Sequence, residues 1–258
     1  MGELDFENVA FGYNGGSLFD DFSASFAMGE VGCIVGPNGC GKSTLAKLAM
    51  GLAKPTSGRV LIQGRDVASL DSRERACRLG VLVQQQEAPM MTVGELAACG
   101  RFPHHGPFSR ISDEDAQSID AALSLAGVLE LRDRPLQSLS GGQRQRARMA
   151  MVLAQDTPIV LLDEPTSFMD AAACFDMARL IRQVRACGKT VIAVIHDLNL
   201  ALSVADTVFV MGRGRLMAQG TPSEEGVHRA IEQSFGICLE RAETTRGVAW
   251  VPFECDGV

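Results

Sequence analysis

A glycine-rich loop directly after a short apolar segment is the feature that most constrains the fold of this chain. The apolar segment Val31–Val35 runs into the sequence Gly-Pro-Asn-Gly-Cys-Gly-Lys-Ser at positions 36–43, and residues 42–52 continue with a pattern typical of a helix. This order of strand, loop and helix is the context that a phosphate-binding loop requires. It predicts an α/β fold in which a strand delivers the loop to the N-terminus of a helix.

Each residue type in this loop has a physical reason. Gly36, Gly39 and Gly41 allow backbone N–H groups to converge on phosphate oxygens that side chains would obstruct. The positive end of the following helix points at the same oxygens. Lys42 supplies a charge near the β and γ phosphates, and the Ser43 hydroxyl can bind Mg²⁺. A glycine-rich turn with only a structural role is the alternative, and the Lys-Ser-Thr sequence at the loop's end argues against it.

The rest of the chain alternates strands with helices, which indicates a mainly parallel sheet covered on both faces. Apolar alternation predicts antiparallel strands near the N-terminus, at 4–11 and 58–63. Further strands are expected at 79–83, 159–163, 190–195 and 207–211, and a helix at 224–235. Helical spacing and capping pairs, Thr92 with Glu95 and Ser112 with Asp115, predict a helical insertion at about 88–156.

Composition excludes several classes of function. A net charge of −7 argues against nucleic acid as the main partner, because phosphate-backbone affinity needs clustered Lys and Arg. No apolar run approaches the roughly 20 residues that span a bilayer, and the acidic N-terminus lacks the features of a signal peptide. We therefore expect a cytosolic chain whose eight cysteines, which form no CxxC pair, are reduced thiols.

Two more segments carry chemistry. Ser140, Gly141 and Gly142 open a helix, and their N–H groups offer a second anion site, although an isolated Ser-Gly-Gly would be only a helix cap. Asp163 and Glu164 end an apolar strand. Two carboxylates at the edge of a core are costly unless a metal or proton chemistry compensates them.

The phosphate loop, the sequence Leu-Ser-Gly-Gly-Gln at 139–143 and the acidic strand end, in this order, resemble the ATP-binding cassette (ABC) ATPases from about Leu4 to Thr221. The resemblance implies an α/β P-loop NTPase (RecA-like) core with an N-terminal antiparallel β subdomain and an inserted helical subdomain. The expected parts are 1–87 with 157–221 as nucleotide-binding core, 88–156 as helical signature subdomain, and 222–258 as C-terminal extension. It also implies a homodimer in which Leu-Ser-Gly-Gly-Gln of one subunit closes over ATP held by the other.

The resemblance implies a role for each site residue. Glu164 polarises the attacking water, and Lys42 and His196 contact the γ phosphate. Gln84 matches the glutamine that senses Mg²⁺ and the attacking water. Because Gln85 and Gln86 follow it, the position of that glutamine stays open by one residue. The implied catalytic residues are Glu164, His196, Gln84 and Lys42, and the implied Mg²⁺ ligands are Ser43, Gln84 and Asp163. The implied ATP-binding residues are Tyr13, Gly36, Asn38, Gly39, Cys40, Gly41, Lys42, Ser43, Thr44, Ser140, Gly141, Gly142, Gln143 and Asp170.

Tyr13 and Asp170 are assigned by position within the family pattern. Tyr13 is placed to stack on adenine; core packing of this residue is the alternative, and Phe11 is the other candidate for stacking. Asp170 ends the loop Ser-Phe-Met-Asp after the acidic strand, where the family usually has Ser-x-Leu-Asp.

Four segments point to the transported cargo. They are Thr92–Leu96 with Gly100–His104, Leu153–Pro158, His196–Ala201 and Phe235–Ile237, and together they resemble importer ATPases for ferric siderophores, haem and cobalamin. The resemblance implies an ABC importer subunit on the cytoplasmic face of the inner membrane, most of all for ferric siderophore. Its implied partners are transmembrane permease subunits and, indirectly, a periplasmic or lipid-anchored substrate-binding protein. The alternative is a soluble ABC ATPase that acts in assembly, of the iron–sulfur scaffold type.

The segment around His104 and His105 has no further ligands at a spacing that would hold a metal. We interpret it as a loop that touches a partner protein. Phe102 and Phe108 are the residues expected to dock a cytoplasmic helix of the membrane subunit.

Overall fold

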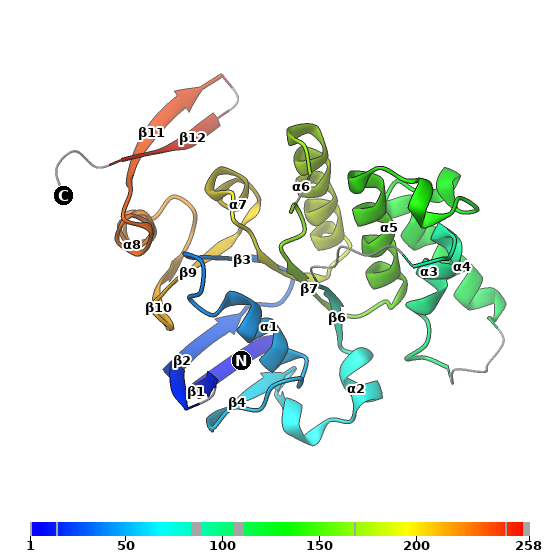
Figure 1. Ribbon diagram of the computed structural model, residues 1–258, viewed down its shortest axis with the longest axis horizontal. Helices are drawn as coiled ribbons and strands as arrows, with labels where there is room; N and C mark the ends of the chain where they lie inside the picture. The colour runs from blue at the N-terminus through cyan, green and yellow to red at the C-terminus, as the bar shows by residue number, and fades with distance from the viewer. Residues whose placement is uncertain are drawn as a thin grey trace. The chain divides into compact units, whose positions relative to one another are not determined.

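The computed structural model describes residues 2–13, 15–83, 89–105, 111–167, 169–245 and 247–254, and Figure 1 shows its elements. The chain forms two compact units, one made of Met1–Ala68 with Ile192–Val258 and the other of Ser69–Val191. The sequence analysis divided the chain by expected function into a nucleotide-binding core, a helical subdomain and a C-terminal extension. The boundaries of these three parts stay a prediction.

An antiparallel sheet opens the first unit, with its strands in the order β2-β1-β4-β5. The bounds are Leu4–Tyr13 for β1, Gly16–Phe26 for β2, Ser57–Ile62 for β4 and Arg65–Asp66 for β5. β1 pairs with β2 and β4 in antiparallel register, so the two predicted N-terminal strands are confirmed. Phe6 of β1 packs edge-on against Phe22 of β2, with ring centroids 5.7 Å apart, an arrangement that aromatic rings favour.

The first unit also contains the strand that leads into the phosphate loop. β3 (Val31–Val35) is buried along its whole length and pairs in parallel with β9 (Thr207–Gly212). The strand order in this unit is β10-β9-β3-β8. β10 (Arg215–Gly220) is antiparallel to β9. The chain re-enters the unit at Ile192, within β8 (Thr190–Val194). Helix α1 (Lys42–Ala49) follows β3, and α7 (Leu198–Val204) follows β8. Continuous apolar strands of this kind are typical of a parallel sheet with both faces covered.

A helix and a β-hairpin complete the first unit. The helix is α8 (Glu225–Phe235), and the hairpin consists of β11 (Cys238–Thr244) and β12 (Gly247–Phe253). The Trp250 N–H donates to Asn199 Oδ1 at 2.9 Å, and the Trp250 ring lies 3.7 Å from the His228 ring. Cys238 is disulfide-bonded, so the expectation of a reduced thiol is wrong there, whereas Cys33, Cys40, Cys77, Cys99, Cys174 and Cys187 are free.

Helices dominate the second unit. They are α2 (Ser72–Ala76), α3 (Val93–Cys99), α4 (Asp113–Leu125), α5 (Gly141–Ala154) and α6 (Ala171–Ala186), beside two parallel strands, β6 (Leu79–Leu82) and β7 (Ile159–Asp163). Figure 1 shows α3, α4 and α5 (green) packed together. Both predicted capping boxes are formed, Thr92 with Glu95 at the start of α3 and Ser112 with Asp115 at the start of α4.

A search for membrane spans covered the part of the chain that the structure describes. None of the helices found there has the length and the apolar character that crossing a membrane requires.

The close approach of α3 and α5 yields a first prediction. Gly100 follows α3, and a Cβ at this position would lie 2.2 Å from the Met151 carbonyl oxygen and 3.1 Å from Ala154 Cβ, both on α5. We expect Gly100→Ala to lower the free energy of unfolding by about 1–3 kcal/mol, because overpacking forces the two helices apart. Urea unfolding of the purified chain measures this effect.

Gly226→Ala in α8 is the matched control for that prediction. An added Cβ at Gly226 meets nothing within 4 Å, and alanine is the better helix former, so no loss of stability is expected. Equal unfolding free energies for the two variants would contradict the tight packing of α3 on α5.

Candidate functional site

The loop after β3 has a backbone that only glycine supports at its tightest points. Gly39 and Gly41 have φ angles of +79° and +108°, a region that side chains disfavour. A Cβ on Gly41 would lie 2.5 Å from Phe19 Cζ, and one on Gly36 would lie 2.5 Å from the Met211 carbonyl oxygen. The loop therefore packs against β2 and β9 on one side and keeps Asn38 and Gly39 exposed on the other.

Lys42 and the start of α1 make this loop electropositive. The Lys42 ammonium donates to the carbonyl oxygens of Gly36 at 2.7 Å and Pro37 at 2.9 Å, and the side chain is almost fully buried. No side chain caps the N-terminus of α1, and its first turn contains no acidic residue. Backbone N–H groups at such a helix end attract anions. The loop thus has the charge and the shape to bind a phosphate group.

Tyr13 lies beside the same helix. Its ring is 49% exposed and packs edge-on against Phe11 with centroids 4.9 Å apart. Its hydroxyl lies 3.4 Å from Thr44 Oγ1, and Lys47 Nζ lies 5.9 Å from the ring centroid. Half exposure does not fit the alternative of a core residue. An accessible aromatic ring next to the phosphate loop suits stacking on a base.

His196 follows the strand beside β3. The Ile195 N–H donates to the Ile34 carbonyl oxygen at 3.3 Å, so the carboxyl ends of β3 and β8 lie side by side. His196 is exposed at this end, and the next residue, Asp197, caps α7 by accepting from the Leu200 N–H at 3.0 Å. The carboxyl edge of a parallel sheet is where α/β folds bind ligands. The structure thus brings His196 to the edge from which the phosphate loop emerges.

In the second unit, the acidic strand end has an unusual backbone. Asp163 is the buried last residue of β7, and Glu164 has a φ angle of +54°, which is rare for a residue with a side chain. The Glu164 carboxylate accepts a hydrogen bond from Ser167 Oγ at 2.9 Å. Strained residues of this kind cluster at active sites. The strain supports a functional reason for Glu164 at this position.

The helix of the Leu-Ser-Gly-Gly-Gln segment begins at an exposed N-terminus. Ser140 Oγ accepts from the Gln143 N–H at 3.2 Å, and Gln143 Oε1 accepts from the Ser140 N–H at 3.0 Å, which forms a capping box. Ser140 and Gly141 are exposed, and the first turn of α5 contains no acidic residue. Gly142 allows α6 to approach, because its Cβ would lie 3.2 Å from Ala173 Cβ. The positive helix end therefore faces outward.

Asp170 has a local partner that the sequence did not indicate. Its Oδ1 accepts from the Ala173 N–H at 2.8 Å and so caps α6. Its expected contact with nucleotide stays a prediction. Gln84, with Gln85 and Gln86, lies outside the described residues, as do Phe108 and Phe168.

The donor chemistry of Ser43 and Asp163 fits Mg²⁺. A hydroxyl and a carboxylate are hard oxygen ligands, and protein Mg²⁺ sites typically combine one or two such groups with phosphate oxygens. Within the described ranges, no group of three or more His, Cys, Asp or Glu side chains is arranged to hold a metal ion. Ser43 and Asp163 each offer one hard oxygen donor, and their binding of one shared Mg²⁺ ion stays a prediction.

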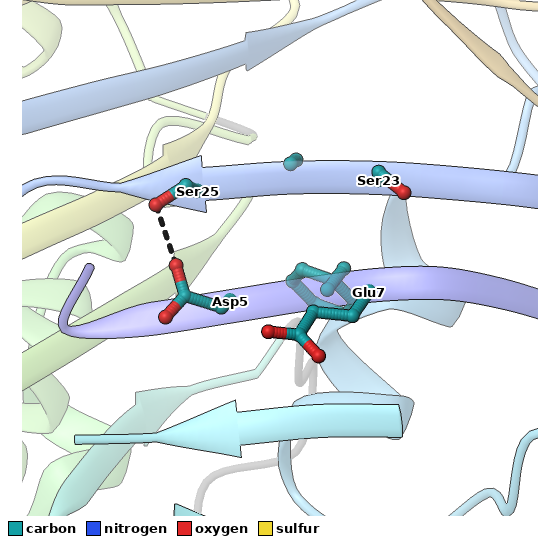
Figure 2. Close-up of a pocket in the computed structure, with 6 residues that line it drawn as sticks. Asp5, Glu7, Ser23 and Ser25 are labelled. Carbon is teal, nitrogen blue, oxygen red and sulfur yellow. Dashed lines mark hydrogen bonds between the residues drawn. The ribbon is translucent and has the colours of Figure 1, made fainter. Parts of the chain in front are cut away.

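A hollow lies on the antiparallel sheet, away from the phosphate loop. It has a volume of about 400 Å³ and is lined by Asp5, Phe6, Glu7, Ser23, Ala24 and Ser25 (Figure 2). Its acidic groups are engaged, because Ser25 Oγ donates to Asp5 and Arg59 Nε donates to Glu7 at 2.6 Å. This hollow does not supply the chemistry of the phosphate loop.

Comparison with known proteins shows what the chain as a whole is similar to. Residues 19–167 match the family described as "ABC transporter". The chain is 39% identical to the ferric enterobactin transport ATP-binding protein FepC of Escherichia coli (strain K12), over 90% of this chain and 86% of FepC. It is 38% identical to the hemin import ATP-binding protein HmuV of Rhodopseudomonas palustris (strain BisB18), over 97% of this chain and 94% of HmuV. The dimeric structure of MJ0796, a bacterial ABC transporter cassette, matches with a TM-score of 0.75 and 27% identity, over 86% of this chain and 99% of that one.

Cys40 offers a chemical test of the loop. Burial raises the pKa of its thiol, and the nearby Lys42 charge offsets this only in part. We expect N-ethylmaleimide at pH 7 to modify Cys40 about tenfold more slowly than the exposed Cys187, because little thiolate is present and access is poor. Adding ATP should slow Cys40 further and leave Cys187 unchanged. Mass spectrometry of the labelled peptides measures both rates, and an ATP-independent rate at Cys40 would argue against nucleotide in the loop.

Proposed function

Because the chain belongs to the ABC transporter family as an ATP-binding subunit, we propose that it hydrolyses ATP to drive the import of a ferric siderophore or haem. One observation carries the proposal: the chain is 38–39% identical, over 90–97% of its length, to the ATP-binding proteins of ferric enterobactin transport and hemin import. Both are transport proteins, so the alternative of a soluble assembly ATPase is not retained.

The ATP site is completed by a second copy of the chain. Asn38 and Gly39 of the phosphate loop are exposed, as are Ser140 and Gly141 at the start of α5, and neither helix has an acidic residue in its first turn. In the proposed dimer, the loop of one protomer holds the triphosphate while Ser140 and Gly141 of the other cover its γ phosphate. The dimeric state of the similar cassette MJ0796 supports this arrangement.

The proposed reaction divides the work among few side chains. Lys42 and the N–H groups of the loop neutralise the phosphates, and Tyr13 stacks on adenine. Glu164 accepts a proton from the attacking water, and His196 contacts the γ phosphate. When bound, Mg²⁺ would neutralise phosphate charge, and the residues proposed to hold it are Ser43, Asp163 and Gln84. Repulsion between the products ADP and phosphate then opens the dimer.

The proposed location is the cytoplasmic face of the inner membrane. Permease subunits would form the pathway, and a substrate-binding protein would deliver the cargo to them from the other side. Phe102, whose side chain is 57% exposed, is the described residue proposed to contact the permease. An exposed aromatic ring of this kind is a common anchor in protein interfaces.

The role of Glu164 yields a direct test. We expect Glu164→Gln to lower ATP turnover by about 10²- to 10⁴-fold, since the amide cannot accept the proton. ATP binding and ATP-dependent dimerisation should persist, because the amide keeps the size of the side chain. Phosphate release and size-exclusion chromatography with ATP measure these properties. Glu130→Gln, at an exposed residue of the second unit, is the control; turnover near the wild-type rate in Glu164→Gln would refute the assignment.

Uptake by intact cells tests the transport function. In the source strain, deletion of the gene should abolish uptake of radiolabelled ferric siderophore or of haem, and cobalamin uptake should be unchanged. The wild-type gene should restore uptake, and the Glu164→Gln gene should not. Normal uptake of ferric siderophore and haem by the deletion strain would overturn the proposal.

A further inference from the structure

A buried carboxylate organises one end of the helical region. Asp115 of α4 is 1% exposed and accepts hydrogen bonds from Ser112 Oγ at 2.7 Å, from Arg101 Nε at 2.9 Å and from His105 Nε2 at 2.8 Å. The bond from the Ser112 hydroxyl, with those from Arg101 and His105, holds the Asp115 pKa well below its ordinary value although burial opposes this. Asp115 is therefore charged at every physiological pH.

Arg101 joins this carboxylate to the C-terminus of α5. Its Nη1 donates to the Ala154 carbonyl oxygen at 2.8 Å, and its side chain is only 11% exposed. His104 Nε2 donates to the next carbonyl, that of Gln155, at 2.8 Å. The last carbonyls of a helix lack partners within the helix, and cationic donors there also complement its dipole. The carbonyl of the last α5 residue and that of its C-cap are thus both bonded by one short segment, residues 101–105.

The same segment is attached to α2 on its other side. Arg73 of α2 donates from Nε to the Pro103 carbonyl at 2.8 Å and from Nη2 to the His104 carbonyl at 2.9 Å. Gly100 leaves no space for movement toward α5, because even a methyl group would overlap the Met151 carbonyl. Phe102 lies between these attachments and is itself 57% exposed. The exposed ring is therefore mounted on a segment with little freedom to move relative to α5.

The opposite end of α5 is the end that begins at Ser140. The helix has 14 residues from Gly141 to Ala154, so its two ends are about 20 Å apart. We expect a helix of this length to move as a rigid body together with the segment that is bonded to its end. Displacement of the segment at Phe102 is then expected to displace Ser140 and Gly141.

We propose that Arg101 is a positioning residue, which couples the surface around Phe102 to the placement of Ser140 and Gly141 by bonding Asp115 and the end of α5 at once. The inference rests on the function proposed above, since it needs a membrane partner at Phe102 and a phosphate at Ser140. Arginine suits this role because its planar group carries several donors in fixed directions, whereas the lysine ammonium is a single point.

The test compares ATP turnover by the purified chain with uptake by cells. In Arg101→Gln, we expect turnover of the purified chain to stay within about twofold of wild type. Uptake of radiolabelled ferric siderophore or haem should fall at least about tenfold, which lies within the range typical of coupling between two sites. Arg101→Lys, which keeps the charge beside Asp115 but cannot make both bonds, should fold stably and also lose uptake. A merely structural role would lower turnover, thermal stability and uptake together.

Arg132→Gln and Arg132→Lys are the matched controls. Arg132 also pairs with an aspartate of α4, Asp120, but the two side chains are 41% and 48% exposed. Both control variants should keep turnover and uptake. Wild-type uptake in Arg101→Lys, or parallel loss of turnover and uptake in Arg101→Gln, overturns the coupling role and leaves the proposed function standing. Unimpaired uptake in the deletion strain overturns the proposed function, and the coupling role with it.

Discussion

The absence of acidic side chains at the start of α1 and α5 is the electrostatic constraint to which the other features of the candidate site relate. In the described part of the chain, six of the eight α-helices carry a carboxylate at the N-cap or in the first turn, for example Asp71 at α2, Asp170 at α6 and Asp197 at α7. The helices α1 and α5 do not. A carboxylate there would satisfy the helix dipole from within the chain. Its absence leaves two positive ends for anions from outside, in a protein whose net charge is −7.

Local interactions explain what was predictable from the sequence. The phosphate loop needs glycines with positive φ angles, and the capping boxes at Thr92, Ser112 and Ser140 need a partner only three residues away. The apolar strands, such as β3 and β7, are buried throughout and appear as uninterrupted hydrophobic runs. Each of these features depends on residues that are neighbours in the chain, so a single sequence contains the whole signal.

Features that depend on distant residues were not predictable in this way. Spacing cannot reveal that Arg101 reaches Ala154, or that Arg73 reaches the carbonyl of His104. The positive φ angle of Glu164 also has no signature in residue type, because glycine or asparagine is expected at such positions. For Asp170, sequence resemblance indicated a ligand contact, while the fold shows a helix cap. One aspartate can do both, since a carboxylate accepts several hydrogen bonds.

The two ends of α5 differ in where their hydrogen-bond partners come from. At its N-terminus the Gln143 N–H is capped by Ser140 of the same segment, whereas the carbonyls of Ala154 and Gln155 at its other end are bonded by side chains from residues 101–105. The C-terminus of α1 is closed instead by its own backbone, through the N–H groups of Met50, Gly51 and Leu52. The phosphate-loop helix is thus complete within its own segment. By contrast, Arg101 and His104 bond the carbonyls of Ala154 and Gln155 at the end of α5, and the proposed coupling from Phe102 to Ser140 depends on these bonds.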